Sequence, residues 1–310
     1  MLLICLNYLS IQYKSAMNKK LSFVALLMLM GGIAFGQRDK LTKALRYYQA
    51  GSLDTARMFI DSASVHPETS KDASTWYYRG YIYKDLYNQR EKSDKQSPIR
   101  LEAVKSFLKQ IELDTAKTLR DNVIKNINYV ATTIYNDAAT SININEYPIA
   151  IGNFDKYKEV IRKIDSARTF NDLEIQLHSA LGSIYMQIYE NDREKNKEFF
   201  DKSRNSFLFV IELDSNNYTA NYNMGILYYN EAVNIIKGLD YDLDLITLEL
   251  IQEETVDLFK KALPYMLKAR DLNPKRKETL IGLSGIYFSL NELEKSEEIE
   301  NEIKLLDTKD

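Results

Sequence analysis

Apolar residues recur at helical spacing along most of the chain, and one such segment occurs twice. Residues 106–116 read SFLKQIELDTA and residues 206–216 read SFLFVIELDSN, with seven identical positions in register. Each copy places apolar side chains three and four positions apart, which predicts an amphipathic helix, and each closes in Leu-Asp, which predicts the end of that helix. Because such a unit cannot bury its apolar face alone, its repetition predicts a stacked array.

The segment that follows the second copy resembles the tetratricopeptide repeat family. In about 34 residues, that family places a large residue, Leu-Gly and Tyr on a first helix, helix A, and Ala, a large apolar residue and Pro on and after a second helix, helix B. Here Met224, Gly225 and Tyr228 match helix A. Further matches in the same phase are Trp76, Gly80, Tyr83, Leu181, Gly182 and Tyr185 on helix A, Ala262, Met266 and Pro274 on helix B, and Ala103 and Phe107 without the proline. The resemblance implies an all-α, tetratricopeptide-like superhelical solenoid of about six helix-turn-helix units.

The inner units depart from the family spacing between helix A and helix B. The family's Tyr and Ala are about nine positions apart, as Tyr47 and Ala56 are here, but Tyr228 and Ala262 are 34 positions apart. The added residues keep apolar side chains at helical spacing, so helix A is predicted to continue by about two or more turns. In an array of such repeats, the A helices line a groove. We expect the lengthened A–B connections to form a wall along one side of this groove, and we expect residues 237–250 of the wall to contact the partner.

Two segments have their own predictions. The third unit spans residues 123–168, with Gly152-Asn153-Phe154 expected as the turn between its two helices. Pro264 is expected in or near the first turn of a helix, because proline in a helix interior costs about 3 kcal/mol. Since the apolar pattern extends upstream of Pro264, a kink at that position is the expected compromise.

Composition agrees with a helical protein. The 310 residues include only 11 glycines and 5 prolines, and 45% of them are hydrophobic. Residues 37–310 are therefore interpreted as one tetratricopeptide-like domain. The net charge is −3, and no cluster of Lys and Arg is interleaved with aromatic residues, so nucleic acid is not an expected partner.

Residues 17–36, MNKKLSFVALLMLMGGIAFG, have the three parts of a secretory signal. Lys19 and Lys20 precede an apolar run that ends in small residues, and this run is shorter than the roughly 20 residues of a membrane-spanning helix. Residues 1–36 are thus expected to be an N-terminal extension and signal peptide, with Met17 as the start and cleavage after Gly36; whether residues 1–16 are translated is open. The mature chain is expected to be exported, periplasmic or extracellular, without stable membrane insertion.

Candidate catalytic and metal-binding residues are few. His66 and His178 have no Cys, second His or paired acid at ligand spacing. The D-x-D-x-D of residues 240–244 resembles the opening of a calcium loop, but Leu245 and Ile251 occupy the positions where that loop needs Gly and Glu. Acidic residues that precede a helix beginning near Leu245 are the better interpretation. We therefore expect no catalytic residue, no metal and no cofactor.

Aromatic residues occupy the positions that line the groove in the family. The positions one, five and eight after the large residue of helix A are Tyr77, Tyr81 and Lys84 in the second unit and Tyr222, Ile226 and Tyr229 in the fifth. Tyrosine offers a large contact area at low entropic cost and keeps a hydrogen-bonding tip, so these residues are the candidate partner-binding set. The alternative is that the tyrosines pack against the neighbouring helix B, and both interpretations are kept.

Three hypotheses for function follow. The first is a noncatalytic protein- or peptide-binding scaffold in the bacterial cell envelope, which binds through the aromatic helix-A groove. The second is a glycan-handling or envelope-assembly subunit that uses the extended A–B edge. The third is an enzyme with a site in the long insertion of the fifth unit. The partner and the oligomeric state are left open.

The exported protein is predicted to begin at Gln37, because the signal closes at Gly36. The intact mass of the secreted chain measures this directly. A secreted species that retains residues 21–36 would contradict cleavage.

Overall fold

The computed structural model describes residues 39–239 and 242–307. The expected N-terminal extension and signal peptide, residues 1–36, lie outside the described residues. The chain divides into two compact units, one of Met1–Ala138 with Ile151–Ala167 and one of Ala139–Ala150 with Arg168–Asp310. Each unit is described by itself.

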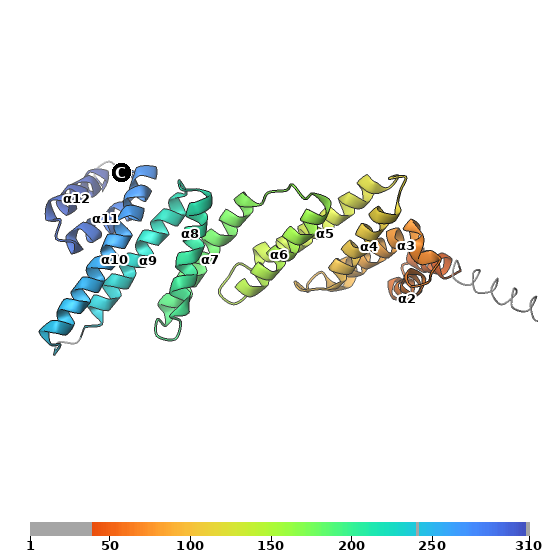
Figure 1. Cartoon of the computed structure of the whole chain (residues 1–310), viewed down its shortest axis with the longest axis horizontal. Helices are drawn as coiled ribbons and strands as arrows, with labels where there is room; N and C mark the ends of the chain where they lie inside the picture. Colours follow the sequence, from red (N-terminus) through yellow and green to blue (C-terminus); the bar gives the residue numbers. More distant parts are fainter. Residues whose placement is uncertain (1–38, 240–241, 308–310) are drawn as a thin grey trace, which may run out of the picture. The chain divides into compact units, whose positions relative to one another are not determined.

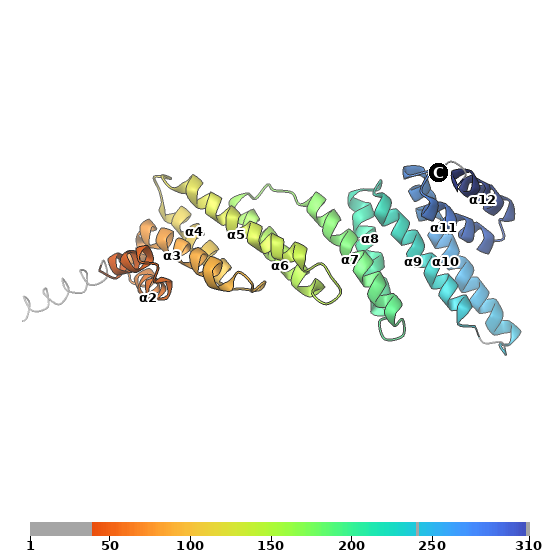
Figure 2. The same cartoon turned by 180° about the vertical axis from the view of Figure 1, so that it is seen from behind.

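Every regular element in the described ranges is helical (Figures 1 and 2). The first unit holds the helical residues 39–49, α2 (Leu53–Ser64), η1 (Thr69–Lys71), α3 (Ala73–Leu86), η2 (Tyr87–Glu91), α4 (Ile99–Leu113) and most of α5 (Arg120–Thr140) and α6 (Tyr147–Ile164). The second unit holds α7 (Asn171–Asn191), α8 (Glu198–Leu213), α9 (Tyr218–Lys237), α10 (Leu245–Leu272), α11 (Lys277–Ser289) and α12 (Leu293–Asp307). The all-α prediction is confirmed.

Consecutive helices pack as hairpins, and a glycine of the first helix faces a large side chain of the second. In the pair α7 and α8, a Cβ atom at Gly182 would lie 2.5 Å from Cε1 of Phe207. Gly80 on α3 is covered in the same way by Phe107 of α4. Since these residues came from the repeat motif, the tetratricopeptide-like hairpin is confirmed in each unit.

The same packing is looser in the pair α9 and α10. A Cβ atom at Gly225 would lie 3.1 Å from Cε of Met266, and Met266 is itself fully buried. At Gly238, which caps the end of α9, the nearest atom would be 3.5 Å away and belongs to the backbone. The helices therefore approach closely at Gly225 and not at Gly238.

The predicted lengthening of helix A is confirmed. α7 has 21 residues and α9 has 20, whereas α11 has 13. In the first unit, α3 continues into the π-helical turn η2. The added turns pack beside one another, because Tyr189 of α7 donates a 2.6 Å hydrogen bond to Glu231 of α9. These turns form the expected wall.

The prediction for the turn of the third unit is wrong. Gly152 and Asn153 lie inside α6, and the connection between α5 and α6 is residues 141–146. There the side chain of Asn143 accepts hydrogen bonds from the backbone N–H groups of Asn145 and Glu146, at 3.0 and 3.1 Å. Asn153 is instead buried and donates a 2.9 Å hydrogen bond to the carbonyl of Lys95. This bond satisfies both buried polar groups.

The prediction that Pro264 lies in a first helical turn is also wrong. Pro264 lies well inside α10, which runs from Leu245 to Leu272. Phe259 and Met266, on either side of it, are at most 2% exposed. Burial of each such side chain contributes roughly 1.5–3 kcal/mol, which offsets the cost of about 3 kcal/mol for proline.

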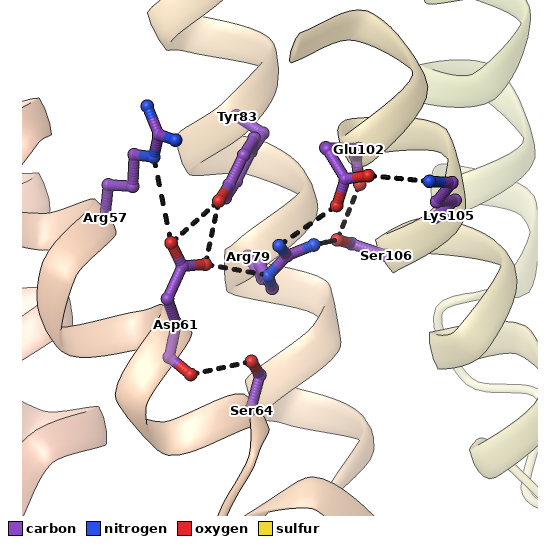
Figure 3. A network of polar contacts seen from close by, with 8 residues as sticks. All are labelled: Arg57, Asp61, Ser64, Arg79, Tyr83, Glu102, Lys105 and Ser106. Atoms are coloured by element: carbon purple, nitrogen blue, oxygen red, sulfur yellow. Dashed lines mark hydrogen bonds and ion pairs between the residues drawn. The ribbon is translucent and has the colours of Figure 1, made fainter. Parts of the chain in front are cut away.

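A polar network joins the first two hairpins of the first unit (Figure 3). The guanidinium of Arg79 on α3 donates to Asp61 of α2 at 3.0 Å, and to Glu102 and Ser106 of α4 at 3.1 and 2.6 Å. Tyr83 donates to the same carboxylate of Asp61, at 2.7 Å. Because the Arg79 side chain is only 12% exposed, its planar fork fixes three helices in one register.

Gly182→Ala is expected to lower the free energy of unfolding by about 1–3 kcal/mol, since the new Cβ atom would overlap the buried ring of Phe207. The matched control is Gly152→Ala, which meets no atom within 4 Å on another part of the chain. Because alanine favours a helix, this control should raise stability by about 0.5–1 kcal/mol. Urea unfolding of both variants provides the measurement. Equal effects of the two substitutions would show that the ring does not set the spacing of the helices.

Candidate binding groove

The sequence-predicted residues of the second repeat lie on the face of α3 that meets α5. Tyr81 donates a 2.6 Å hydrogen bond to Oδ1 of Asn122 and accepts one of 2.8 Å from Nδ2 of Asn126. Lys84 donates to Oδ1 of Asn126 at 2.8 Å and lies 4.4 Å from the ring centre of Tyr81. The structure thus brings Tyr77, Tyr81 and Lys84 together, as neighbours of the next helix A.

These side chains already satisfy much of one another's hydrogen-bonding capacity. Tyr77 stacks at a tilt on Tyr81, with ring centres 4.9 Å apart, and its hydroxyl lies 3.4 Å from Oδ1 of Asn122. Burial, followed by the hydrogen bond to Tyr81, raises the pKa of Tyr77 to about 12. The hydroxyl of Tyr77 therefore stays protonated near neutral pH. The row is a half-buried interface between helices whose outer edge is open to solvent.

The corresponding residues of the fifth repeat pack against α11. A Cβ atom at Gly285 would lie 2.7 Å from the hydroxyl of Tyr229, and one at Gly282 would lie 3.6 Å from Cδ1 of Ile226. Burial raises the pKa of Tyr222, whose ring stacks on Tyr218 at 5.9 Å. These three side chains hold α9 against α11. Tyr229 also packs on Phe259 of α10, with ring centres 5.7 Å apart, which is the packing on helix B that the alternative interpretation expects.

The two histidines and Asp244, which were considered as catalytic or metal-binding residues, make contacts that stabilise the fold. The ring of His178 packs on Phe209, with centres 4.3 Å apart, and Nδ1 of His66 accepts the backbone N–H of Glu68 at 3.3 Å. Asp244 caps α10 by accepting the N–H of Thr247 at 3.0 Å, which lowers the pKa of its carboxyl. Within residues 39–239 and 242–307, no three His, Cys, Asp or Glu side chains cluster as metal ligands would. Among the same residues, no helix has the length and apolar content that crossing a bilayer requires.

An apolar hollow lies where α9 and α10 project past α11. The α9–α10 pair is longer than the α11–α12 pair that packs on it, so in Figures 1 and 2 the far ends of α9 and α10 extend beyond α11. Along this projection runs a hollow of about 1020 Å³. Its lining, named here the α10 groove, consists of Ile236, Leu239, Leu245, Leu248, Glu249, Ile251, Gln252, Thr255, Val256, Phe259, Phe288, Ser289 and Asn291.

The walls of the α10 groove expose large apolar side chains. Leu245 is 84% exposed and Phe288 is 67% exposed, while Ile236 and Leu248 are 45% and 39% exposed. Phe259 at the floor is 2% exposed and belongs to the core between α9, α10 and α11. Full burial of a Leu or Phe side chain is worth roughly 1.5–3 kcal/mol. A contiguous set left open in this way is typical of an interaction surface.

The electrostatic surroundings of the α10 groove are negative. Glu249 lines the groove. Asp242 lies just before the start of α10, and Glu253 lies on α10 one turn after Glu249. Two helices also end at the groove, α9 at Lys237 and α11 at Ser289, and the C-terminus of a helix carries partial negative charge.

A second, polar hollow of about 530 Å³ lies among α7, α8 and α9. Arg193 donates to Glu231 at 3.0 Å, and Tyr189 donates to the same carboxylate. Burial and this hydrogen bond raise the pKa of Tyr189 well above its usual range. Phe200 forms an apolar edge of the hollow beside these polar groups.

The sequence predicted partner contacts near the α10 groove but not the groove itself. Residues 237–250 were expected to carry partner contacts as part of the wall, but no groove residue was named. Leu245, Leu248 and Phe259 are spaced so that they lie on one face of a helix, and this spacing can be seen in the sequence. The signal that it stays uncovered is the short length of α11, which ends at Ser289.

Comparison with known protein families finds no matching family model, and no curated protein matches. Among solved structures, the chain is similar to a TPR repeats protein (BF2334) from Bacteroides fragilis, at 16% identity over 81% of this chain and 97% of that chain, with a TM-score of 0.42. It is also similar to the TPR2AB domain of yeast Sti1 in complex with pHSP90, at 11% identity over 89% and 92% of the chains, with a TM-score of 0.31. The MamA protein is similar at 11% identity over 88% and 92%, with a TM-score of 0.27. These scores carry no conclusion about function.

Proposed function

We propose that this protein is a noncatalytic scaffold that binds a segment of another protein in the α10 groove. The observation that carries this proposal is the exposure of Leu245 and Phe288 across a hollow whose floor, Phe259, belongs to the core. Binding that covers such side chains contributes favourable free energy without new chemistry. Glu249 is the one titratable residue in the lining of the groove, so the lining holds no pair of groups for acid–base catalysis, which favours a scaffold over an enzyme.

The helix-A row remains a proposed second contact for the same kind of partner. Tyr77, Tyr81 and Lys84 present a half-buried edge with hydroxyl, amide and ammonium groups, which suits the backbone of an extended peptide. Ile226 and Tyr229 are less available because they pack on Gly282 and Gly285. The proposal therefore moves the principal contact from the aromatic row to the α10 groove.

Export to the bacterial cell envelope, periplasmic or extracellular, is part of this proposal. It is supported by the basic start, apolar run and small residues of residues 17–36. A scaffold there would hold partner segments outside the cytoplasm.

Glycan binding is kept as the second candidate function, and the polar hollow among α7, α8 and α9 is the feature that favours it. Phe200 supplies an aromatic edge, and Arg193 and Glu231 supply charged groups that can bond sugar hydroxyls. Since Tyr189 is only 7% exposed and bonded to Glu231, little of its ring is free to stack on a sugar. The peptide-binding proposal is therefore ranked first.

The test is selection of binders from a displayed library of random 18-residue peptides against the purified chain. Selected peptides are expected to titrate to saturation in fluorescence anisotropy. The double variant Leu245→Ser/Phe288→Ser should weaken that binding at least tenfold, because it removes two exposed apolar walls. Its melting temperature should be nearly unchanged, since exposed substitutions shift stability by about 0.5 kcal/mol or less.

The matched control is Met58→Ser/Val65→Ser, which removes side chains that are 60% and 80% exposed on and just after α2. This control should bind as the parent chain does. Saturable binding of envelope oligosaccharides with no selected peptide would favour the glycan candidate. Peptide binding that survives loss of both groove side chains would refute the α10 groove as the site.

A further inference from the structure

The α10 groove lies where a longer α11 would pack. In the preceding pair of repeats, the lengthened end of α7 is covered by the lengthened end of α9. There Tyr189 donates to Glu231 at 2.6 Å and Asn230 donates to Glu190 at 2.8 Å. The next helix A, α11, stops at Ser289 and leaves the end of α9, with the adjoining half of α10, without such a cover. A helix that continued past the end of α11 would fill this place.

The apolar positions of α10 are spaced to receive a helix. Leu245, Leu248 and Thr255 line the groove together with Phe259, so one face of α10 is presented along several turns. Side chains three and four positions apart on one helix form the ridges and grooves into which a second helix packs. Phe288, near the end of α11, closes the far side.

The charges around the groove determine which charged residues a bound helix can carry beside its apolar face. Between Lys237 and Phe259, every charged residue in the described part of the chain is acidic, apart from Lys237 itself. Of these acids, Asp257 is paired with Lys261 at 2.6 Å and Glu254 lines the polar hollow instead. Glu249 lines the groove, and Glu253 is exposed one turn further on α10, next in sequence to the lining residue Gln252, so the rim near the groove is negative. The C-termini of α9 and α11 add negative potential at the groove end.

We propose that the α10 groove binds an amphipathic helix of a partner protein, with an apolar face and with Lys or Arg on its flanks. This inference rests on the proposed function, because it names the class of segment that the scaffold holds. Leu and Phe side chains of the partner helix enter between Leu248 and Phe288, and its cationic flanks meet Glu249 and Glu253. Recognition of this kind reads anchors at positions i, i+3, i+4 and i+7 of the bound helix.

Two other occupants fit the same apolar surface less well. An anionic lipid surface would meet the acidic rim of α10, so like charges would oppose its binding. A second copy of this chain would bring an equally acidic α10 against the first in a two-fold contact. Both occupants are outcomes of the test.

The experiment uses two designed 18-residue helical peptides with the same leucine face, one flanked by Lys and one flanked by Glu. The Lys-flanked peptide is expected to bind the purified chain at least tenfold more tightly in 50 mM NaCl, and this ratio should shrink in 500 mM NaCl because salt screens the rim. Glu249→Lys/Glu253→Lys should reverse the preference between the two peptides. The control Glu297→Lys/Glu300→Lys changes the net charge equally on the exposed face of α12 and should keep the preference.

Equal affinities for the two peptides, or a preference for Glu flanks, would overturn the inference. If library-selected peptides bind in the groove but lack basic flanks, this inference fails and the proposed function stands. If no peptide binds, both fail. Binding to phosphatidylglycerol vesicles that Leu245→Ser/Phe288→Ser abolishes would assign the groove to a membrane. A dimer in light scattering that the same variant dissociates would assign it to a second copy, and either result would overturn the partner helix.

Discussion

The contact between a bare glycine backbone and a buried ring sets the spacing on which this fold depends. Phe207 has no exposed surface and lies where a Cβ atom at Gly182 would have to be, and Phe107 does the same at Gly80. The two helices of the α3–α4 hairpin and of the α7–α8 hairpin are thereby held at a distance that only glycine permits, because packed interiors tolerate little added volume. Polar groups then fix the register between hairpins in the first unit, where Arg79 reaches the carboxylates of Asp61 and Glu102.

Once that spacing is fixed, helix length decides which surfaces stay open. In the second unit, α7 and α9 are lengthened together, and their added turns cover one another through Tyr189 and Glu231. α10 is lengthened as well, but α11 has only 13 residues and cannot cover it. The exposed groove is thus a consequence of unequal helices in an otherwise regular stack. Because α11 is shorter than α9, apolar side chains of α10 that a longer helix would cover stay exposed.

The hairpins could be predicted from the sequence because their signals are local: Gly182, Tyr185 and Phe207 recur in one phase with their counterparts in other units. The lengthening of helix A was readable for the same reason. The turn of the third unit was misplaced because Gly152 and Asn153 look like turn residues, although burial of the Asn153 amide against a carbonyl favours a helix. The groove itself depends on where α11 ends relative to α10, which is a comparison between units. The packing of Tyr229 on Gly285 is likewise a contact between units, and the sequence of one repeat does not predict it.

The most direct test of the central claim is hydrogen–deuterium exchange of the full chain with and without a bound Lys-flanked helical peptide. The projecting half of α10 leaves Leu245 and Leu248 exposed, so its amides should exchange faster than those near Phe259 and should slow when the groove is filled. The account predicts protection at residues 236–239, 245–256 and 286–291, with no change in α3 and α5. Protection confined to the row of Tyr77 and Tyr81, with unchanged exchange along α10, would contradict it.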